Sequence, residues 1–454
     1  MPSRLALLLF LQGFALATEP LDPVPNKAVH APQPPPIPSA QAVAASLPKD
    51  GLLGEHELTL MAIAKRPELE KLRGAANTAI AFKRAAHDLV NPELRLSYAE
   101  DSSISKGALF RFALPHPWER KAKIQRAAAE VSLAEAEYYA GEDALVRQVR
   151  RSFAELAILQ AKLDLQKNRR AAYEAHRDWL EERKVPSLGL DLAAARAKVY
   201  QTLSDIRVLE SSTSALRQEL AIYCGLDDPN RIDTSIQTRR IQDPALLDVE
   251  YLTSMAMLYR TDVLSDQARL TVARAQLSEV KAKRIPAATF IDLGYTQIDN
   301  PRRSNNNKEE WFARVGVSIP LWDWIGFNKQ HQVHEASSQS LEIKIRLQQQ
   351  IISNEIKQAV KLLAESETQI RSHDKDLQAI QSDMKTSMAD AEMAATGVED
   401  LIKSRRIQHE FQDLSQQMEI SRLSALSAYQ EALMSLENAL GIRVERALRL
   451  TINP

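Results

Sequence analysis

Four short segments of the chain alternate between apolar and polar residues, and they come in two pairs. The first pair covers about residues 93–100 and 107–115, and the second covers about 287–298 and 311–320. A repeat of two residues is typical of β-strands, because successive side chains of a strand point to opposite faces of the sheet. Each segment has about 8 to 11 residues, the length that a tilted strand needs to cross a lipid bilayer. The pattern predicts two strand hairpins of membrane length.

Long stretches with apolar residues at every seventh position follow each pair of strands. The clearest stretch lies in the second half, at Ile356, Leu363, Ile370, Leu377, Met384, Ala391 and Val398. A sustained seven-residue repeat indicates helices that pack against partner helices as a coiled coil. It predicts two pairs of long helices, at about 119–184 and 190–223 in the first half and at about 327–396 and 404–440 in the second.

The same order of elements occurs twice, and matched landmarks indicate a duplication. Phe110–Pro115 corresponds to Val315–Pro320, and Cys224-Gly225-Leu226 corresponds to Leu440-Gly441-Ile442. A repeat of this length is a duplicated domain half rather than a short solenoid unit. The chain then divides into a first repeat (51–226), a linker (227–249), a second repeat (250–443) and a C-terminal tail (444–454).

The N-terminal residues have the features of an export signal. Residues 1–17 combine a positive charge at Arg4 with a short apolar core and a small-residue cleavage site ending at Ala17. The alternative, an apolar helix cap, is disfavoured by Pro2 and by the nine prolines of residues 18–50. That Pro-rich segment is expected to form an extended tether.

Composition excludes several classes of protein. The formal net charge of -1 gives no support for a nucleic-acid partner. A mean hydropathy of -0.31 argues against a bundle of membrane-spanning helices. The single cysteine, Cys224, cannot close an intrachain disulfide.

An exported chain with membrane-length strands still has to pair its strand edges, and four strands cannot close a barrel. We therefore expect other copies to complete it, with three copies giving a 12-stranded β-barrel.

Several local motifs resemble the TolC family of outer-membrane efflux channels over about residues 55–443. They lie where strands begin and end, and where the second half opens: Asn91–Leu94, Pro115–Lys121, Arg260–Val263, Ala282–Pro286 and Ile319–Asp323. Asn91–Leu94 and the residues from Pro115 to Arg126 are most similar to the CzcC-like heavy-metal efflux branch of that family.

This resemblance implies a fold, a location and partners. The fold would be mostly α-helical with a small β part: a trimeric 12-stranded β-barrel continued by a periplasmic α-helical barrel. The homotrimer would lie in the lipid of the cell outer membrane with most of its mass in the periplasm. It would dock onto a periplasmic adaptor (membrane fusion) protein, which recruits an inner-membrane pump. The chain would be a passive duct for metal ions or toxic organic compounds, without a cofactor and without enzyme activity.

The turns between the long helices are the predicted docking tips for the adaptor. The first tip comprises Val185, Pro186, Ser187, Leu188, Gly189 and Asp191, and the second comprises Gly397, Lys403, Arg405 and Arg406. Asp191 matches the acidic position after the family's tip, although an acidic residue also suits a helix N-terminus. The second tip departs from the family pattern because it is basic. Asp390, Glu399 and Asp400 are candidate gate carboxylates, with a solvated helix face as the alternative.

Aromatic and metal-binding residue types complete the candidates. Trp118, Trp322 and Trp324 fall where strands meet helices, which is typical of aromatics at a membrane interface. His331 and His334 could face together on a helix, but no metal site is predicted. Two alternative functions stay open: a duct for type I protein secretion, and a periplasmic coiled-coil adaptor or structural protein.

Overall fold

A computed structural model describes residues 52–88, 91–100, 104–114, 116–183, 189–232, 244, 247–283, 285, 287–299, 308–318, 323–394 and 398–444. All of them belong to one unit of the chain, Pro38–Pro454, while the other unit, Met1–Ile37, lies outside the described residues. The predicted signal segment and Pro-rich tether therefore lie outside the description, as does the tail beyond Val444.

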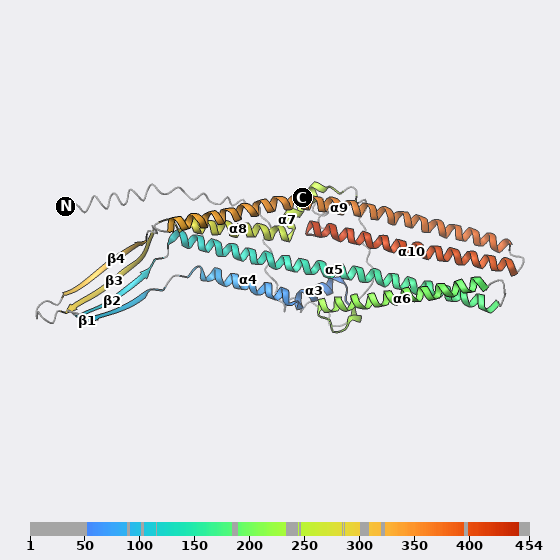
Figure 1. The fold of residues 1–454 in the computed structure, drawn as a ribbon, viewed down its shortest axis with the longest axis horizontal. Coiled ribbons are helices and arrows are strands. Elements are labelled where there is room, and N and C mark those ends of the chain that lie inside the picture. Colours follow the sequence, from blue (N-terminus) through green and yellow to red (C-terminus); the bar gives the residue numbers. More distant parts are fainter. Residues whose placement is uncertain are drawn as a thin grey trace. The chain divides into compact units, whose positions relative to one another are not determined.

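The two halves of the chain contain the same series of elements (Figure 1). In the first half these are α3 (Glu55–Lys65), α4 (Pro67–Ala85), β1 (Glu93–Glu100), β2 (Ile104–Ala113), α5 (Pro117–Arg183) and α6 (Gly189–Cys224). A short 3-10 helix, η2 (Pro229–Arg231), follows α6. In the second half they are α7 (Val249–Tyr259), α8 (Thr261–Ala282), β3 (Ala287–Asp299), β4 (Lys308–Ser318), α9 (Asp323–Ala394) and α10 (Val398–Leu440). The predicted fold class, a duplicated and mostly helical chain with a small sheet, is confirmed.

Local sequence explains where several helices begin. Pro67 occupies the first position of α4, where its missing N–H costs no hydrogen bond, and Arg66 before it has an extended backbone. The Asp248 carboxylate accepts hydrogen bonds from two N–H groups of the first turn of α7, at 2.9 and 3.3 Å. Helix α10 begins at Val398, ahead of the expected start near residue 404. Glu399 and Asp400 then fall in its first turn, where the helix dipole favours negative charge.

The four strands form one antiparallel sheet in the order β1-β2-β3-β4. Strand β2 begins at Ile104, three residues before the expected start at about 107, and pairs along the whole of β1. The central pair, β2 with β3, joins the two halves of the chain, with Phe110 opposite Leu293. The outer edges of the sheet are therefore β1, from the first half, and β4, from the second.

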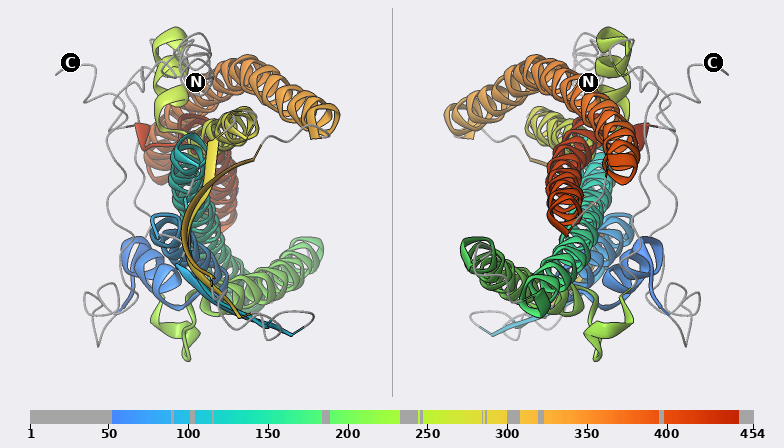
Figure 2. Two further views of the ribbon diagram at one scale, coloured as in Figure 1. Left: turned by 90° about the vertical axis from the view of Figure 1, so that its left-hand side faces the viewer. Right: turned by 90° about the vertical axis from the view of Figure 1, so that its right-hand side faces the viewer.

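The long helices pack as two antiparallel pairs (Figure 1). Helical hairpin 1 consists of α5 and α6, and helical hairpin 2 consists of α9 and α10. Helix α10 also packs on α5, so hairpins 1 and 2 lie side by side, with α6 and α9 as the flanking helices in both views of Figure 2. The seven-residue repeat of α9 supplies the seam of hairpin 2, since Ile356, Leu363 and Ile370 are fully buried in one core with Tyr429 and Leu436. Burying each such side chain contributes about 1.5–3 kcal/mol.

Each repeat ends at a glycine in the left-handed region, Gly225 with φ 64° and Gly441 with φ 71°. The two glycines follow α6 and α10 and pack against the breaks between α3 and α4 and between α7 and α8. Lys65 donates a hydrogen bond of 2.6 Å to the carbonyl oxygen of Gly225. The duplication therefore reproduces one packing arrangement in both halves.

Candidate functional site

One face of the sheet is apolar and exposed. The strand register places alternate residues of all four strands on this face. Its large exposed side chains are Leu94, Leu96, Tyr98, Phe110, Phe112, Leu293, Trp311, Val315 and Val317. Exposed apolar side chains gathered on one surface mark a contact with a membrane or with another protein.

The opposite face of the sheet carries charges. Glu93, Arg111, Asp292 and Arg314 stand opposite one another in a single row across the four strands. Arg111 donates two hydrogen bonds to the Asp292 carboxylate, at 2.7 and 2.8 Å, and this pair connects the two halves of the chain. The sheet thus separates an apolar face from a charged face, and among the described residues no further strand pairs with its edges β1 and β4.

A cluster of polar side chains connects helical hairpins 1 and 2. We define this inter-hairpin cluster as Arg169, Tyr173 and His176 of α5, Lys198 of α6, and His409 and Asp413 of α10. Its centre is the Asp413 carboxylate, which accepts hydrogen bonds from Arg169 at 2.7 Å, from Lys198 at 2.9 Å and from the Tyr173 hydroxyl. One carboxylate of hairpin 2 is therefore held by three donors of hairpin 1.

The electrostatics of the cluster keep Asp413 charged. Burial acts to raise the pKa of this carboxyl, but hydrogen bonds from Tyr173, Lys198 and Arg169 outweigh it and lower the pKa to about 2. Burial, together with the hydrogen bond to Asp413, raises the pKa of Tyr173 to about 12. Asp413 is consequently ionised, and Tyr173 is a hydrogen-bond donor, throughout the neutral range.

Two histidines stack within the same cluster. The His176 and His409 ring centroids are 3.9 Å apart with an interplanar angle of 27°. Burial, followed by the neighbouring His176, lowers the pKa of His409 to about 4, while burial and then the charge of Arg405 lower the pKa of His176. Both histidines therefore bind a proton less readily than a free histidine does.

Apolar side chains support the contact on the tip side of the cluster. Leu180 and Ala195 are buried in hairpin 1, with Trp179 and Leu192 packed against them. Ile402 of α10 packs on the same group, so hairpin 2 contributes to it.

The predicted first tip is described only in part. Val185, Pro186, Ser187 and Leu188 lie outside the described residues, as does Gly397 of the second tip. Gly189 begins α6, and Asp191 lies in its first turn. The Asp191 carboxylate lies 3.9 Å from the Arg406 guanidinium of α10. The structure therefore brings Asp191 of the first tip near Arg406 of the second.

The basic residues predicted at the second tip lie on the surface of α10. Lys403 and Arg405 are exposed on α10, and Arg405 donates a hydrogen bond of 2.7 Å to the Gln408 side chain. Asp390 lies in α9, and Glu399 and Asp400 lie in α10, but their side chains lie outside the description. Their role as gate carboxylates stays a prediction.

Of the three predicted interface tryptophans, Trp118 is the one whose side chain is described. Trp118 lies in the first turn of α5, is 39% exposed, and its ring meets that of His116 edge-on at 5.8 Å. Trp322 lies outside the described residues, and of Trp324, in the first turn of α9, only the backbone is described.

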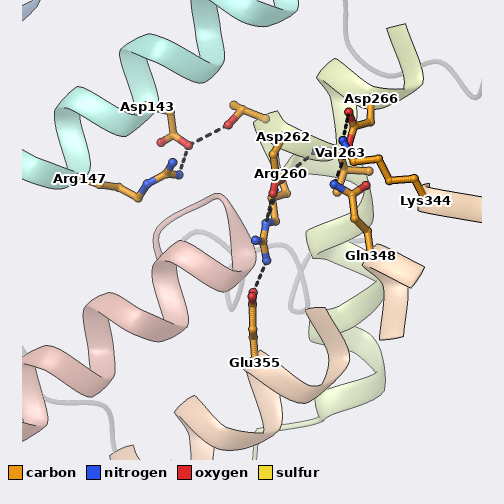
Figure 3. A network of polar contacts seen from close by, with 10 residues as sticks. Asp143, Arg147, Arg260, Asp262, Val263, Asp266, Lys344, Gln348 and Glu355 are labelled. Atoms are coloured by element: carbon orange, nitrogen blue, oxygen red, sulfur yellow. Dashed lines mark hydrogen bonds and ion pairs between the residues drawn. The ribbon is translucent and has the colours of Figure 1, made fainter. Parts of the chain in front are cut away.

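The Arg260–Val263 motif of the second half belongs to a polar network between helices (Figure 3). Arg260 donates to the Glu355 carboxylate of α9. Asp266 of α8 is buried and accepts hydrogen bonds from Lys344 at 2.8 Å and from Gln348 at 2.7 Å, both on α9. The motif therefore stabilises the packing of α8 on α9.

No helix in the described ranges has an apolar stretch long enough to cross a membrane. Within the same ranges, no group of three or more His, Cys, Asp or Glu side chains could hold a metal ion, and His331 instead lies 3.5 Å from the Glu335 carboxylate.

The inter-hairpin cluster was missed by sequence reasoning, although the sequence carries a signal for it. Arg169, Tyr173 and His176 are spaced four and three residues apart, and His409 and Asp413 four apart. Such spacings place polar side chains on one face of each helix. From the sequence alone, a polar face of this kind is predicted to be solvent-exposed, because the sequence does not identify its partner helix.

The fold is shared with several solved membrane proteins. CusC, a protein that forms a transmembrane channel, has a TM-score of 0.66 and 17% identity over 87% of this chain and 96% of CusC. A membrane protein from Pseudomonas aeruginosa has a TM-score of 0.63 and 18% identity over 87% of this chain and 92% of its own. The outer-membrane channel OprN has a TM-score of 0.61 and 14% identity over 85% of this chain and 89% of its own. No family model and no curated protein sequence matches the chain.

These similarities establish the fold of the chain as that of TolC-like outer-membrane channels. The resemblance predicted from the sequence is confirmed at this level. The assignment to the CzcC-like branch stays a prediction.

Proposed function

We propose that this chain is one subunit of a homotrimeric outer-membrane channel, the passive duct of a tripartite efflux system. The observation that carries the proposal is the sheet, with an exposed apolar face, a charged face and two open edges. A strand edge cannot face lipid unpaired, because its N–H and C=O groups would have no partners. Pairing β4 of one copy with β1 of the next satisfies both edges, and three copies give a 12-stranded barrel.

The two faces of the sheet then have distinct environments. The apolar face, with Leu96 and Trp311, would contact lipid, while the row containing Arg111 and Asp292 would line an aqueous interior. Alternation of apolar-out and polar-in residues is the pattern of membrane barrels that enclose water.

The flanking helices support the same assembly. Helix α6 exposes Leu190, Tyr200, Val208 and Ile222, and α9 exposes Val333, Ile343, Leu347, Ile351 and Leu362. These are the outer helices of hairpins 1 and 2, and their inner sides already pack on α5 and α10. The occupant that we propose for both faces is a second copy of the chain, because the same copies that complete the sheet would lie against α6 and α9.

The helical part would form a periplasmic tube that meets an adaptor protein at the tips, including Asp191, Arg405 and Arg406. The adaptor would recruit an inner-membrane pump that drives small solutes, metal ions or toxic organic compounds, into the duct. The inter-hairpin cluster would hold the periplasmic end in its narrow state, since widening requires hairpin 2 to move away from hairpin 1. The chain itself would catalyse no reaction.

The assembly is tested by the mass of the purified protein in detergent and by its flotation with liposomes. The proposal predicts a particle containing three chains of at most 50.8 kDa each, which floats with lipid in a density gradient. A monodisperse monomer that stays in the aqueous fraction would contradict it.

A further inference from the structure

The stacked histidines have so far been described only as members of the inter-hairpin cluster, without a role of their own. We propose that His176 and His409 form a proton-sensitive site, at which protonation in an acidic periplasm weakens the contact between hairpins 1 and 2 and favours opening of the duct. Opening of the duct rests on the proposed function, whereas the proton-sensitive site depends only on contacts within this chain.

The geometry of the pair disfavours two positive charges. The ring centroids are 3.9 Å apart, and the rings come from different hairpins, α5 and α10. Tyr173 lies 5.4 Å from the His409 ring, and Trp179 lies stacked 6.2 Å from the His176 ring. These aromatic neighbours limit the access of solvent to the pair. Two imidazolium ions at this separation repel each other, and partial burial strengthens the repulsion.

The charged groups around the pair do not offer a free counter-ion. Two cations face it, Lys198 of α6 and Arg405 of α10. Arg169 of α5 is instead bonded to Asp413. The two anions are Asp413 and Asp191. Asp413 already accepts three hydrogen-bond donors, and Asp191 lies 3.9 Å from Arg406. An added proton on either imidazole therefore enters a site whose carboxylates already have cationic partners.

The direction of the pH effect follows from linkage. The pKa of His409 is lowered to about 4 in the docked hairpins, so the docked state binds fewer protons than the separated state. Contact stability is fully present above the pKa of a free histidine, about 6.5, and decreases as the pH falls below it. For this one residue, lowering the pH from about 7.5 to about 5.5 shifts the equilibrium about tenfold toward separation.

Asp413 and Tyr173 of the cluster do not change charge in that window. Asp413, with a pKa lowered to about 2, stays ionised, and Tyr173, with a pKa raised to about 12, stays protonated. The hydrogen bonds to Asp413 therefore persist while the histidines titrate. This arrangement assigns the response to His176 and His409 rather than to Asp413 or Tyr173.

The experiment measures the separation of the hairpins directly, by spin labels on the purified full chain. Labels at Ala175→Cys of α5 and Gln412→Cys of α10 are placed at exposed positions, in a Cys224→Ala background. Labelled chains are diluted with unlabelled chains so that each particle carries one pair. Pulsed electron resonance then records the distance distribution at about pH 7.5 and about pH 5.5.

The expected result is a longer-distance population that grows about tenfold relative to the short one at the lower pH. The double variant His176→Phe with His409→Phe keeps two stacked rings that cannot be protonated, and it should abolish the growth. His373→Phe, in α9 of hairpin 2 and outside the cluster, is the matched control and should respond like the unsubstituted protein. The proposal is overturned if the unsubstituted protein shows no pH response, or if the double Phe variant responds equally.

Planar-bilayer conductance of the same variants separates the two proposals. A protein whose labels respond to pH but that forms no channel contradicts the proposed function and leaves the proton-sensitive site intact. A protein that conducts, but whose labels do not respond, contradicts the site alone.

Discussion

A methyl group added to Gly441 would lie 2.6 Å from the Cα of Arg260, at the point where the end of α10 meets the break between α7 and α8. The corresponding group on Gly225 would lie 2.8 Å from Cδ of Lys65, which belongs to a flexible side chain. Both glycines also have positive φ, so each contributes a backbone conformation that other residues adopt at a cost. The two halves thus share an arrangement but differ in how tightly it is packed.

This difference predicts unequal effects of the same substitution. Gly225→Ala should destabilise the folded chain by about 1 kcal/mol, mainly through the left-handed backbone, because Lys65 can move aside. Gly441→Ala should cost about 3 kcal/mol, because the backbone of Arg260 cannot move without disturbing α7 and α8. Thermal unfolding followed by circular dichroism compares the two. Equal melting temperatures for the two variants would contradict the packing described here.

Neutralising Asp413 should loosen the contact between the helical hairpins. Asp413→Asn keeps the size of the side chain but removes the charge that Arg169 and Lys198 share. Hydrogen bonds to a charged group contribute about 1.5–3 kcal/mol each, so the open fraction should rise at least about tenfold. Single-channel recording measures that fraction. Asp383→Asn, at an exposed position of α9, is the control and should leave it unchanged.

Reversing the charge of the tips should weaken docking of the adaptor without affecting assembly. The change is Asp191→Arg, or Arg405→Glu combined with Arg406→Glu. The Arg406–Asp191 pair is largely exposed and 3.9 Å long, so its loss should cost the chain well under about 1 kcal/mol. Chemical cross-linking to the adaptor should decrease, while the detergent mass stays that of the trimer. Lys385→Glu, on an exposed part of α9, serves as control. Undiminished cross-linking in the tip variants would remove the tips from the docking surface.

Trp118 should lie at the interface between lipid and water. Its ring is partly exposed beside the end of β2, and an indole combines an apolar body with an N–H that needs a polar partner. Brominated or spin-labelled lipids with quenchers at different depths should quench its fluorescence most strongly near the headgroups. A variant with Trp118→Phe gives the signal of the other tryptophans for subtraction. Insensitivity of the Trp118 signal to every quencher depth would contradict an interfacial location.

Periodicity alone predicted much of the fold. The two-residue repeat identified the strands, and the seven-residue repeat identified the seam that Ile356, Leu363 and Ile370 form. The pairing of β2 with β3 could not be predicted, because it joins residues as distant as Arg111 and Asp292, which are 181 positions apart. A local pattern reports which face of an element is apolar, and it does not report which element covers that face.

The candidate site shows the same limit more strongly. The predicted tip residues Asp191 and Arg406 were found from their position at the turns and their charge, and the structure brings them near each other. Tyr173, His409 and Asp413 were missed because each reads as an ordinary polar residue on a long helix. Their shared role depends on the packing of α10 against α5, which lies outside the information in any one helix.

The central claim, that this chain builds a duct through a membrane, is tested most directly by single-channel recording. The purified protein would be added to a planar bilayer, and the Asp413→Asn variant would be recorded beside it. We predict insertion of a trimer with small conductance that increases in the variant, because the periplasmic end is then less tightly held. A protein that remains monomeric and never inserts, in either form, would contradict the assignment of the sheet to a membrane barrel.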